Sequence, residues 1–320
     1  MAPGTSYSTQ VAEAIRKEAL RLGFTACGFS EAAGLDKEGA VLTHWLAENM
    51  HAGMTYMANN FEKRTDPTLL VEGAKTVISL LLNYYSPEKQ KDPDAPVLSK
   101  YAWGTDYHEV MKNRLRELYR FIEEHFGPVN GRIFTDSAPV MEKAWAQRAG
   151  LGWIGRNGNL INRKAGSFVF IGEIILDLEL PPDRPESDFC GSCDRCIEAC
   201  PTGAINSNRT IAAHRCISYN TIELKGEIEP SLSGRFMNRV FGCDICQDVC
   251  PWNRKAQPHT VEEFGPRRAL LELSKNEWYT LDEDRYRSLF SHSAVKRARY
   301  EGLRRNLEFL KGETPSPGVA

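Results

Sequence analysis

Eight of the nine cysteines in this chain lie between Cys190 and Cys250, and this clustering constrains the fold more than any other feature. Nine cysteines are too few for a disulfide scaffold of 320 residues, so the cluster indicates one local inorganic or redox site. The first run has the spacing C-x2-C-x2-C-x3-C-P that is typical of bacterial ferredoxins. It consists of Cys190, Cys193, Cys196 and Cys200, followed by Pro201. In such a run three thiolates bind one 4Fe-4S cluster and the fourth binds its neighbour, so a second cluster is predicted.

The ligands of a second cluster follow further along the chain. A shorter run with the same spacing consists of Cys243, Cys246 and Cys250, followed by Pro251. Val240 occupies the position of the missing fourth cysteine, and Cys216 is available to replace it. The eight cysteines then form two sets of four: Cys190, Cys193, Cys196 and Cys250 in one, and Cys200, Cys216, Cys243 and Cys246 in the other.

Zinc is the alternative occupant of these cysteines, because tetrahedral zinc sites also use C-x2-C pairs. A triple run that ends in Cys-Pro suits two cubane clusters better than it suits structural zinc. The ninth cysteine, Cys27, lies in a predicted strand over residues 25–29, where we expect it to be a small buried hydrophobic residue.

Helical and strand patterns alternate along the first part of the chain. Apolar periodicity predicts helices over residues 10–22, 107–125 and 137–148, and strands over residues 76–85, 131–135 and 168–180. This interleaving predicts an α+β (mixed α/β) fold, in which a first domain, residues 1–182, contains a mixed sheet. The proline-bearing segment 181–188 is a linker by composition. We therefore expect a ferredoxin-like two-cluster module over residues 183–255 and a helical C-terminal region over residues 256–320.

Composition and hydropathy exclude several classes of protein. Hydrophobic residues make up 42% and charged residues 26% of the chain, as in soluble globular proteins. The N-terminus lacks the apolar stretch of a secretory signal, and no segment approaches the ~20 apolar residues of a membrane span. We therefore expect a cytoplasmic protein without membrane contact. Two clusters in series form an electron relay, and the long segment ahead of them predicts a catalytic domain that receives single electrons.

Several motifs around the cysteines resemble the epoxyqueuosine reductase family. They are GMTYMANNFEKRTDP (53–67), YAWGTDYH (101–108), TDSAPVMEKAWAQRAGLGWIGRNGNLIN (135–162), HRCISYNTIELKG (214–226) and NRVFGCDICQDVCPWN (238–253). The resemblance implies an oxidoreductase that binds cobalamin and two 4Fe-4S clusters. It implies reduction of the epoxide of epoxyqueuosine, at the wobble position of a tRNA anticodon, to queuosine and water, the last step of queuosine biosynthesis.

The same resemblance implies roles for individual residues. Asp136 matches the family's catalytic aspartate and is expected to donate a proton; the alternative is a helix cap. The residues expected to contact cobalamin are Met57, Tyr101, Asp136, Arg156, Asn157, Gly158, Asn159, Leu160 and Ser218. A plain turn is the alternative for residues 155–160, whose backbone amides would otherwise hold the cofactor. Tyr101 and Tyr107 are alternatively core aromatic residues, and His108 a structural histidine.

The expected partners are a tRNA and an external low-potential electron donor of ferredoxin or flavodoxin type, and the protein is expected to be a monomer. The residues expected to contact tRNA are Lys225, Lys296, Arg297 and Arg299. Between residues 291 and 306, five Lys and Arg residues oppose a single carboxylate, a local charge of +4 that suits tRNA phosphates. The alternative is an ordinary solvated basic face.

Two other functions fit part of the pattern. A reductive dehalogenase shares the corrinoid and two-cluster design, but such enzymes usually carry a twin-arginine signal and a tyrosine acid, whereas this chain has Asp136. A non-catalytic two-cluster electron carrier would leave the first domain without a role.

Overall fold

The computed structural model describes residues 6–312, which include all predicted sites and exclude most of the C-terminal segment GETPSPGVA. An antiparallel four-stranded sheet forms the first part, with the spatial order β1 (Ala26–Glu31), β2 (Thr76–Asn83), β7 (Val169–Leu176) and β4 (Gly131–Phe134). The α+β class is confirmed, whereas the prediction of a mixed sheet is wrong because all three strand pairings are antiparallel. A continuous apolar segment such as β2 indicates a strand that is buried on both faces of a sheet. Such burial occurs in parallel and in antiparallel sheets, so it does not indicate the direction of the neighbouring strands.

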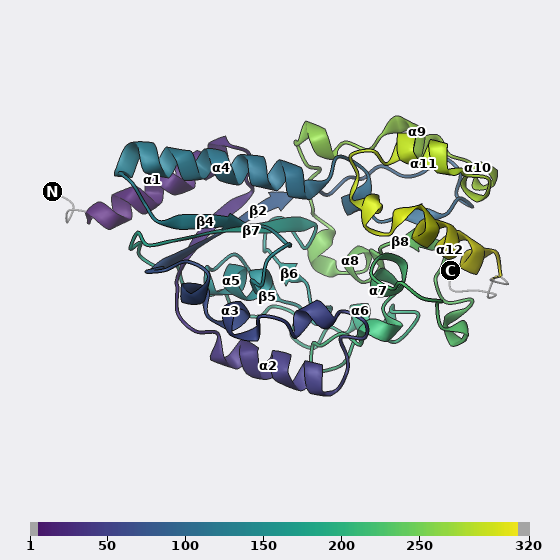
Figure 1. The fold of residues 1–320 in the computed structure, drawn as a ribbon, viewed down its shortest axis with the longest axis horizontal. Coiled ribbons are helices and arrows are strands. Elements are labelled where there is room, and N and C mark those ends of the chain that lie inside the picture. Colours follow the sequence, from purple (N-terminus) through teal and green to yellow (C-terminus); the bar gives the residue numbers. More distant parts are fainter. Residues whose placement is uncertain (1–5, 313–320) are drawn as a thin grey trace.

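Helices cover both faces of this sheet (Figure 1). On one face lie α1 (Tyr7–Arg21) and α4 (Tyr107–Phe126), and on the other lie α2 (Asp36–Ala47), α3 (Phe61–Thr65) and α5 (Glu142–Arg148). Ser6 caps α1, because its hydroxyl accepts a hydrogen bond from the amide of Thr9 at 3.3 Å.

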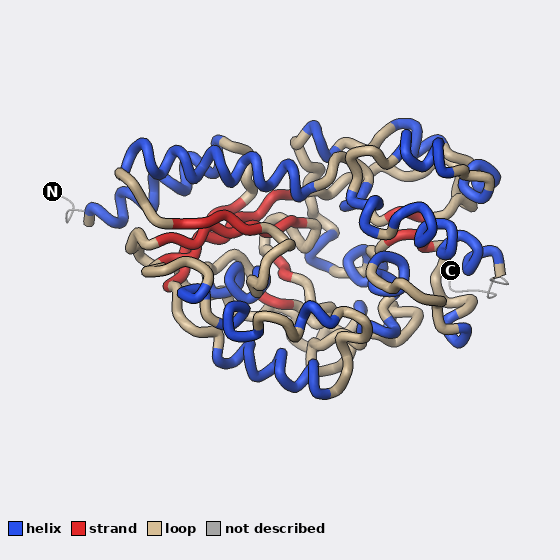
Figure 2. The backbone as a smooth tube through the Cα atoms, viewed as in Figure 1, coloured by secondary structure: helices blue, strands red, loops and turns tan. Residues whose placement is uncertain are grey.

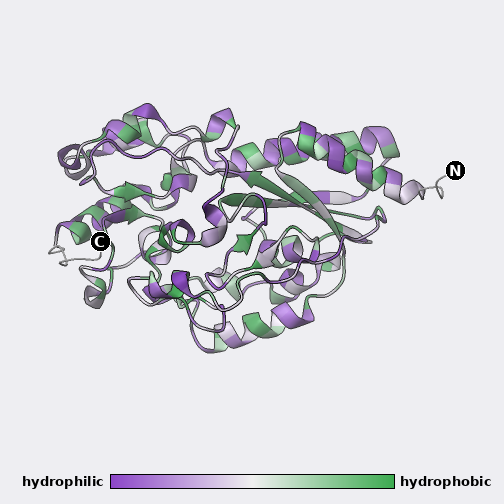
Figure 3. Ribbon diagram, turned by 180° about the vertical axis from the view of Figure 1, so that it is seen from behind, coloured by the Kyte–Doolittle hydropathy of each residue, from purple (hydrophilic) through white to green (hydrophobic). Residues whose placement is uncertain are grey.

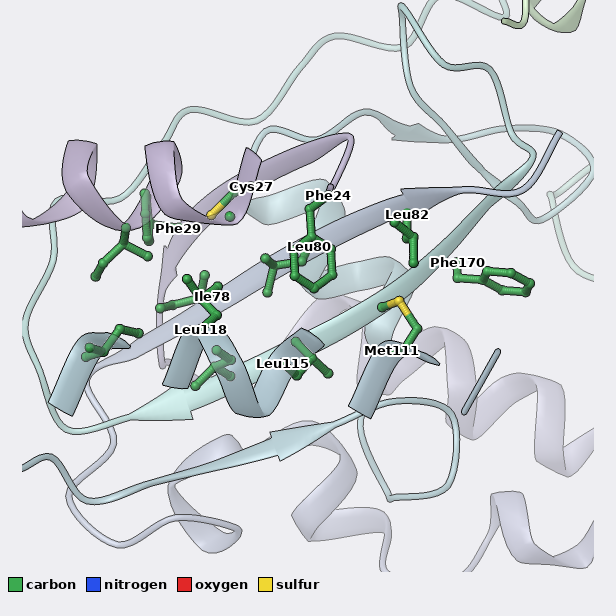
Figure 4. Packing of buried hydrophobic residues seen from close by; sticks show 14 of the residues in the cluster. Phe24, Cys27, Phe29, Ile78, Leu80, Leu82, Met111, Leu115, Leu118 and Phe170 are labelled. Carbon is green, nitrogen blue, oxygen red and sulfur yellow. The ribbon is translucent and has the colours of Figure 1, made fainter. Parts of the chain in front are cut away.

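The main hydrophobic core fills the space between α1, α4 and the sheet (Figure 4). Met111, Leu115 and Leu118 of α4 are fully buried, and they face Ile78 and Leu80 of β2. Cys27 belongs to this core, as expected, with an exposure of 3%. Burial raises the pKa of the Cys27 thiol to about 12, so this cysteine stays protonated and packs as a hydrophobic residue. In Figure 3 the strands of the sheet are predominantly hydrophobic.

A second core joins a short segment of the first half of the chain to its C-terminal part. Residues 95–103 pack with residues 217–310, and β3 (Val97–Leu98) pairs in parallel with β8 (Arg239–Phe241). Short helices and loops dominate this part (Figure 2). Its helices are α6 (Arg195–Glu198), α7 (Ile217–Ile222), α8 (Ile245–Asp248), α9 (Arg268–Glu272), α10 (Lys275–Tyr279), α11 (Glu283–Leu289) and α12 (Arg299–Lys311).

Three local features bear on the site. The hairpin of β5 (Trp153–Ile154) and β6 (Leu160–Ile161) carries the glycine-rich loop at its turn. The helix predicted from residue 137 begins instead at Glu142, because residues 135–141 form an irregular turn. The basic segment 291–306 is divided between a 3-10 turn, Ala294–Arg297, and α12. Within residues 6–312, no helix has the length and apolar character that crossing a membrane requires.

Candidate active site

Four cysteines converge near the surface, and we call them the outer set: Cys190, Cys193, Cys196 and Cys250. Burial raises the pKa of Cys196, and the charges of Cys250, Cys190 and Cys193 raise it further. Because like charges act on a thiol only when they are close, these four sulfurs share one region. The buried indole of Trp153 donates a hydrogen bond to Cys190 Sγ at 3.3 Å.

The other four cysteines form a second group, and we call them the inner set: Cys200, Cys216, Cys243 and Cys246. Burial raises the pKa of Cys246 well above its ordinary value, and the charges of Cys243 and Cys216 add to this. Burial also raises the pKa of Cys216, on which Cys200 acts in the same direction. Cys196 of the outer set acts on Cys246 as well, so the two sets adjoin. Among the described residues, no three His, Cys, Asp or Glu side chains are grouped closely enough to hold a single metal ion.

Two side chains, Tyr107 and His108, contact the Asp136 carboxylate. We call these three residues the Asp136 group. Asp136 follows β4 in the left-handed region, with φ of +53°. Its carboxylate accepts a hydrogen bond from the Tyr107 hydroxyl and lies 3.3 Å from Nε2 of His108. The helix-cap alternative is wrong, because α5 begins at Glu142 and has no side-chain cap.

The charges of the Asp136 group follow from these contacts. Burial lowers the pKa of His108, but hydrogen bonds to Asp106 and Asp136 outweigh burial and raise the pKa to about 9. Burial raises the pKa of Asp136, but the hydrogen bonds from His108 and Tyr107 outweigh it and lower the pKa. Near neutral pH the pair is therefore an imidazolium beside a carboxylate, and the mobile proton resides on His108.

Two further carboxyl groups lie behind Asp136. The Asp136 amide donates a hydrogen bond to Glu142 Oε1, and burial together with the charge of Asp136 raises the pKa of Glu142 to about 8. Glu173 on β7 has an exposure of 0%, and neither of its carboxylate oxygens has a hydrogen-bond partner among the described residues. Burial and the charges of Glu142 and Asp136 raise the pKa of Glu173 well above its ordinary value. Burial without a hydrogen-bond partner therefore favours the protonated form of Glu173.

Lys143 connects this region with the inner set. Its ammonium donates a hydrogen bond to the carbonyl of Gly158 at 2.8 Å. Burial lowers the pKa of Lys143, and the charges of Cys246 and Glu142 oppose that effect. Asp136 and Lys143 are both exposed to solvent.

The glycine-rich loop forms a tight hairpin turn. The amide of Gly155 donates to the carbonyl of Asn159 at 2.8 Å, and that of Gly158 donates to the carbonyl of Gly155 at 3.0 Å. The amide of Asn159 binds the side chain of Asn157 at 3.2 Å. These three amides are therefore engaged within the turn, contrary to the expectation that they hold a cofactor. The Arg156 guanidinium instead reaches the carbonyl of Gly191 at 2.9 Å, beside the outer set.

The remaining predicted cofactor contacts approach from other segments. The amide of Gly53 donates a hydrogen bond to the Tyr219 hydroxyl at 2.8 Å. This contact places Met57 and Ser218, both half-buried, on adjoining segments. Burial raises the pKa of Tyr101 well above its ordinary value, and the charge of Asp136 adds to this. Tyr101 also packs against both hydrophobic cores, so it is a core aromatic residue beside the Asp136 group.

Comparison with known proteins identifies the family. Residues 64–137 match the model described as epoxyqueuosine reductase QueG, DUF1730, and residues 189–253 match a 4Fe-4S double cluster binding domain. The chain is 52% identical to the epoxyqueuosine reductase of Cellulophaga algicola over 297 residues, which cover 93% of this chain and 97% of that protein. The chain belongs to the epoxyqueuosine reductase family. Its counterpart in Escherichia coli is 39% identical over 311 residues, 96% of this chain and 82% of that protein.

Solved structures of epoxyqueuosine reductases share the fold. A crystal structure described as epoxyqueuosine reductase with an epoxyqueuosine-modified tRNA stem loop aligns with a TM-score of 0.88 and 28% identity, covering 94% of this chain and 80% of that one. The enzyme from Streptococcus thermophilus aligns with a TM-score of 0.86 and 29% identity, covering 94% and 81%. This epoxyqueuosine reductase is therefore an oxidoreductase with a 4Fe-4S double cluster domain.

In this epoxyqueuosine reductase one of the predicted tRNA contacts, Arg297, lies near enough to Asp136 to interact with its charge. Lys225, Lys296, Arg297 and Arg299 are all exposed. Arg297 binds both carboxylate oxygens of Glu223, at 3.1 and 2.8 Å. Arg305 has a structural role, because its guanidinium binds the carbonyls of Leu224 and Gly226 at 2.6 and 2.7 Å.

The sequence did not predict several residues of this site. Tyr56 has an exposure of 43%; burial raises its pKa to about 12, and the charges of Glu223, Arg297 and Asp136 act on it as well. Tyr56 therefore lies near both Arg297 and Asp136. Glu142, Lys143 and Glu173 were also missed. A glutamate inside an otherwise apolar strand, as in VFIGEIIL, was the available signal for Glu173.

Proposed function

We propose that this chain reduces the epoxide of epoxyqueuosine, at the wobble position of a tRNA anticodon, to queuosine in the cytoplasm. The observation that carries the proposal is the Asp136 group, which holds a proton beside Lys143 and the inner set. Its membership of the epoxyqueuosine reductase family, and the fold it shares with a relative solved with an epoxyqueuosine-modified tRNA stem loop, support the same substrate.

We infer that the outer set and the inner set each bind one 4Fe-4S cluster. The mutual effects of the thiolate charges support this division. Zinc does not suit two adjoining sets of this spacing. The proposal assigns residues 1–182 to cobalamin binding and catalysis, residues 183–255 to the clusters, and residues 256–320 to tRNA. Residues 95–103 pack with the C-terminal part, so the first and last regions share a core.

The residues around the Asp136 group suit a large polar cofactor, which we propose is cobalamin. Met57, Tyr101, Arg156 and Ser218 are half-buried and come from separate segments, whereas Asn157 and Leu160 are buried. The proposed contacts are Met57, Tyr101, Asp136, Arg156, Asn157, Gly158, Asn159, Leu160 and Ser218. Since the amides of Gly155, Gly158 and Asn159 are already bonded within the turn, we assign the contact there to other atoms of the loop. When bound, cobalamin supplies a strongly reducing centre.

The residues of the chain supply protons and position the substrate. Reduction of an epoxide to an alkene breaks two carbon–oxygen bonds, takes up two electrons and two protons, and releases water. We propose that His108 holds a proton and passes it to the departing oxygen through the Asp136 carboxylate, which the Tyr107 hydroxyl orients. Glu142, neutral below about pH 8, holds the Asp136 loop in place through the Asp136 amide.

Four exposed cations are suited to an RNA backbone. We propose that Lys225, Lys296, Arg297 and Arg299 contact tRNA phosphates. Arg305 supports the contact indirectly, because it fixes the loop that carries Lys225. Electrons would come from an external low-potential donor.

The test is conversion of tRNA by protein reconstituted without oxygen. A sample loaded with cobalamin and about eight irons per chain, as two 4Fe-4S clusters require, should convert epoxyqueuosine in a tRNA stem loop to queuosine under dithionite. Nucleoside mass spectrometry reads the loss of one oxygen atom. A fully loaded sample that leaves the tRNA unchanged but dehalogenates an organohalide would overturn the proposal.

A further inference from the structure

Phe189 is an exposed aromatic residue at the edge of the outer set. It directly precedes Cys190, and 39% of its surface is accessible to solvent. Gly191 and Ser192, which follow Cys190, are also exposed. The chain around Cys190 therefore brings one edge of the outer set to the surface, whereas Cys216 and Cys246 of the inner set lie near Lys143.

Aromatic contacts connect Phe189 to a cysteine sulfur. The Phe189 ring packs edge-to-face against Trp153, with centroids 5.2 Å apart, and lies 5.9 Å from Trp252. Trp153 is fully buried, and its indole donates the hydrogen bond to Cys190 Sγ at 3.3 Å. An unbroken line of contact thus runs from solvent to the outer set.

The surroundings of Phe189 are basic. The Arg163 guanidinium lies 4.7 Å from the centre of the Phe189 ring, and the Arg156 guanidinium binds the carbonyl of Gly191. Lys164 follows Arg163 and is exposed. Asp188, the carboxylate next to Phe189, is already paired with Arg209.

Further charges adjoin this region along the chain. Arg254 and Lys255, which follow Trp252, are exposed and extend the basic character. Asp194 and Glu198, at α6, oppose part of it. An exposed aromatic residue within a rim of excess positive charge suits transient docking of an acidic protein.

We propose that the face around Phe189, Arg163, Lys164, Arg254 and Lys255 docks an acidic ferredoxin-type protein that reduces the outer set. This inference rests on the proposed function, because only an enzyme that consumes electrons needs such a donor. A ferredoxin suits the role because its iron-sulfur cluster exchanges single electrons at low potential.

The step is a transfer of one electron. One electron would pass from the reduced ferredoxin, which is oxidised, to the 4Fe-4S cluster that Cys190, Cys193, Cys196 and Cys250 would hold, and no bond or proton would change. Two such transfers supply the two electrons that one epoxide requires.

The test measures the rate at which a chemically reduced, acidic plant-type ferredoxin reduces the clusters of the holoenzyme, by stopped-flow absorbance without oxygen. The double variant Arg163→Glu with Lys164→Glu should slow this rate by about tenfold or more at low salt and remove its salt dependence. Reduction by dithionite should be unchanged, because a small reductant needs no docking surface. A matched control, Lys17→Glu with Arg120→Glu, reverses two exposed charges on α1 and α4.

The outcomes separate this proposal from the function. Equal rates for the Arg163/Lys164 variant and the wild type, or equal slowing in the control variant, would overturn the docking face. Faster reduction by a flavodoxin with the same dependence on these charges would overturn the choice of ferredoxin. The absorbance readout needs no tRNA, so a failure of tRNA conversion under dithionite would count against the proposed function alone.

Discussion

The two cysteine sets differ in how the chain builds them. The outer set takes three of its four thiols from one short loop, lies near the surface and is bordered by aromatic residues. The inner set takes its thiols from three separate segments and lies beside Lys143, close to the Asp136 group. The outer set is therefore placed to receive electrons from outside the protein, and the inner set is placed to deliver them to the site of epoxide reduction. Changes near the inner set should therefore stop the reaction, and changes near the outer set should limit delivery of electrons.

The largest effect is expected from removing single ligands. Cys216→Ala should abolish turnover with every reductant, because the last step of the relay is removed. Cys190→Ala should abolish turnover driven by ferredoxin but leave a measurable rate with dithionite, which can reduce the inner set directly. Iron content should fall by about half in both variants. Equal residual activity of the two variants under dithionite would contradict the different roles assigned to the outer and inner sets.

His108 should determine the alkaline limit of the reaction. Since the pKa of His108 is raised to about 9, it is protonated at neutral pH, and turnover should fall as the pH rises through about 9. His108→Gln should lower turnover by about a hundredfold and remove this alkaline limb. Asp106→Asn removes one of the contacts that raise the His108 pKa, so it should move the limb to lower pH. A limb that stays in place in both variants would contradict the role of His108.

Glu173 should make the stability of the fold depend on pH. Its pKa in the folded state is raised above the ordinary value of 4.5, so its contribution is fully present below pH 4.5 and is lost as the pH rises. Glu173→Gln should therefore stabilise the protein at pH 8 relative to pH 5 by at least about 1 kcal/mol, since one pKa unit corresponds to about 1.4 kcal/mol. Urea unfolding at both pH values measures this difference. The exposed Glu179→Gln is the control, and an equal change in both variants would contradict the assignment.

The smallest effect is expected from the proposed tRNA contacts. Lys296→Ala with Arg299→Ala should weaken binding of a tRNA stem loop several-fold and reduce its salt slope by about 0.7 to 0.9 for each phosphate that is no longer neutralised. Turnover at saturating tRNA should change little. The same measurement on Lys17→Ala with Arg120→Ala should give the wild-type slope. If the salt slope is unchanged in the Lys296/Arg299 variant, these residues do not contact tRNA phosphates and form an ordinary solvated basic surface.

Local patterns in the sequence predicted much of the fold. The helix at residues 107–125 is observed as α4, Tyr107–Phe126, because its apolar residues recur with helical spacing. The cysteine spacing likewise predicted two sets, since spacing is itself the signal for cluster ligands. Strand direction was not predictable from β2, whose residues are buried on both faces in either arrangement.

The chemistry of the site was harder to predict, because distant segments create it. The sequence around His108 suggests no more than a structural histidine, since nothing local indicates that β4 ends beside the start of α4 and brings Asp136 to it. Glu173 is buried only because two neighbouring strands and α5 cover it. Helix α2 was missed because its apolar residues form no regular buried face: Gly39 and Leu42 are its only buried residues.

The central claim is that the Asp136 group supplies a proton, and the inner set supplies electrons, to the same epoxide. A single-turnover reaction tests it most directly: holoenzyme is reduced by dithionite, mixed with epoxyqueuosine-modified tRNA, and the queuosine formed per chain is counted. The wild type should form about one queuosine per chain, whereas Asp136→Asn, with the same iron and corrinoid content, should be slower by a factor of about 100 to 10,000. Formation of queuosine by Asp136→Asn at the wild-type rate would contradict the claim.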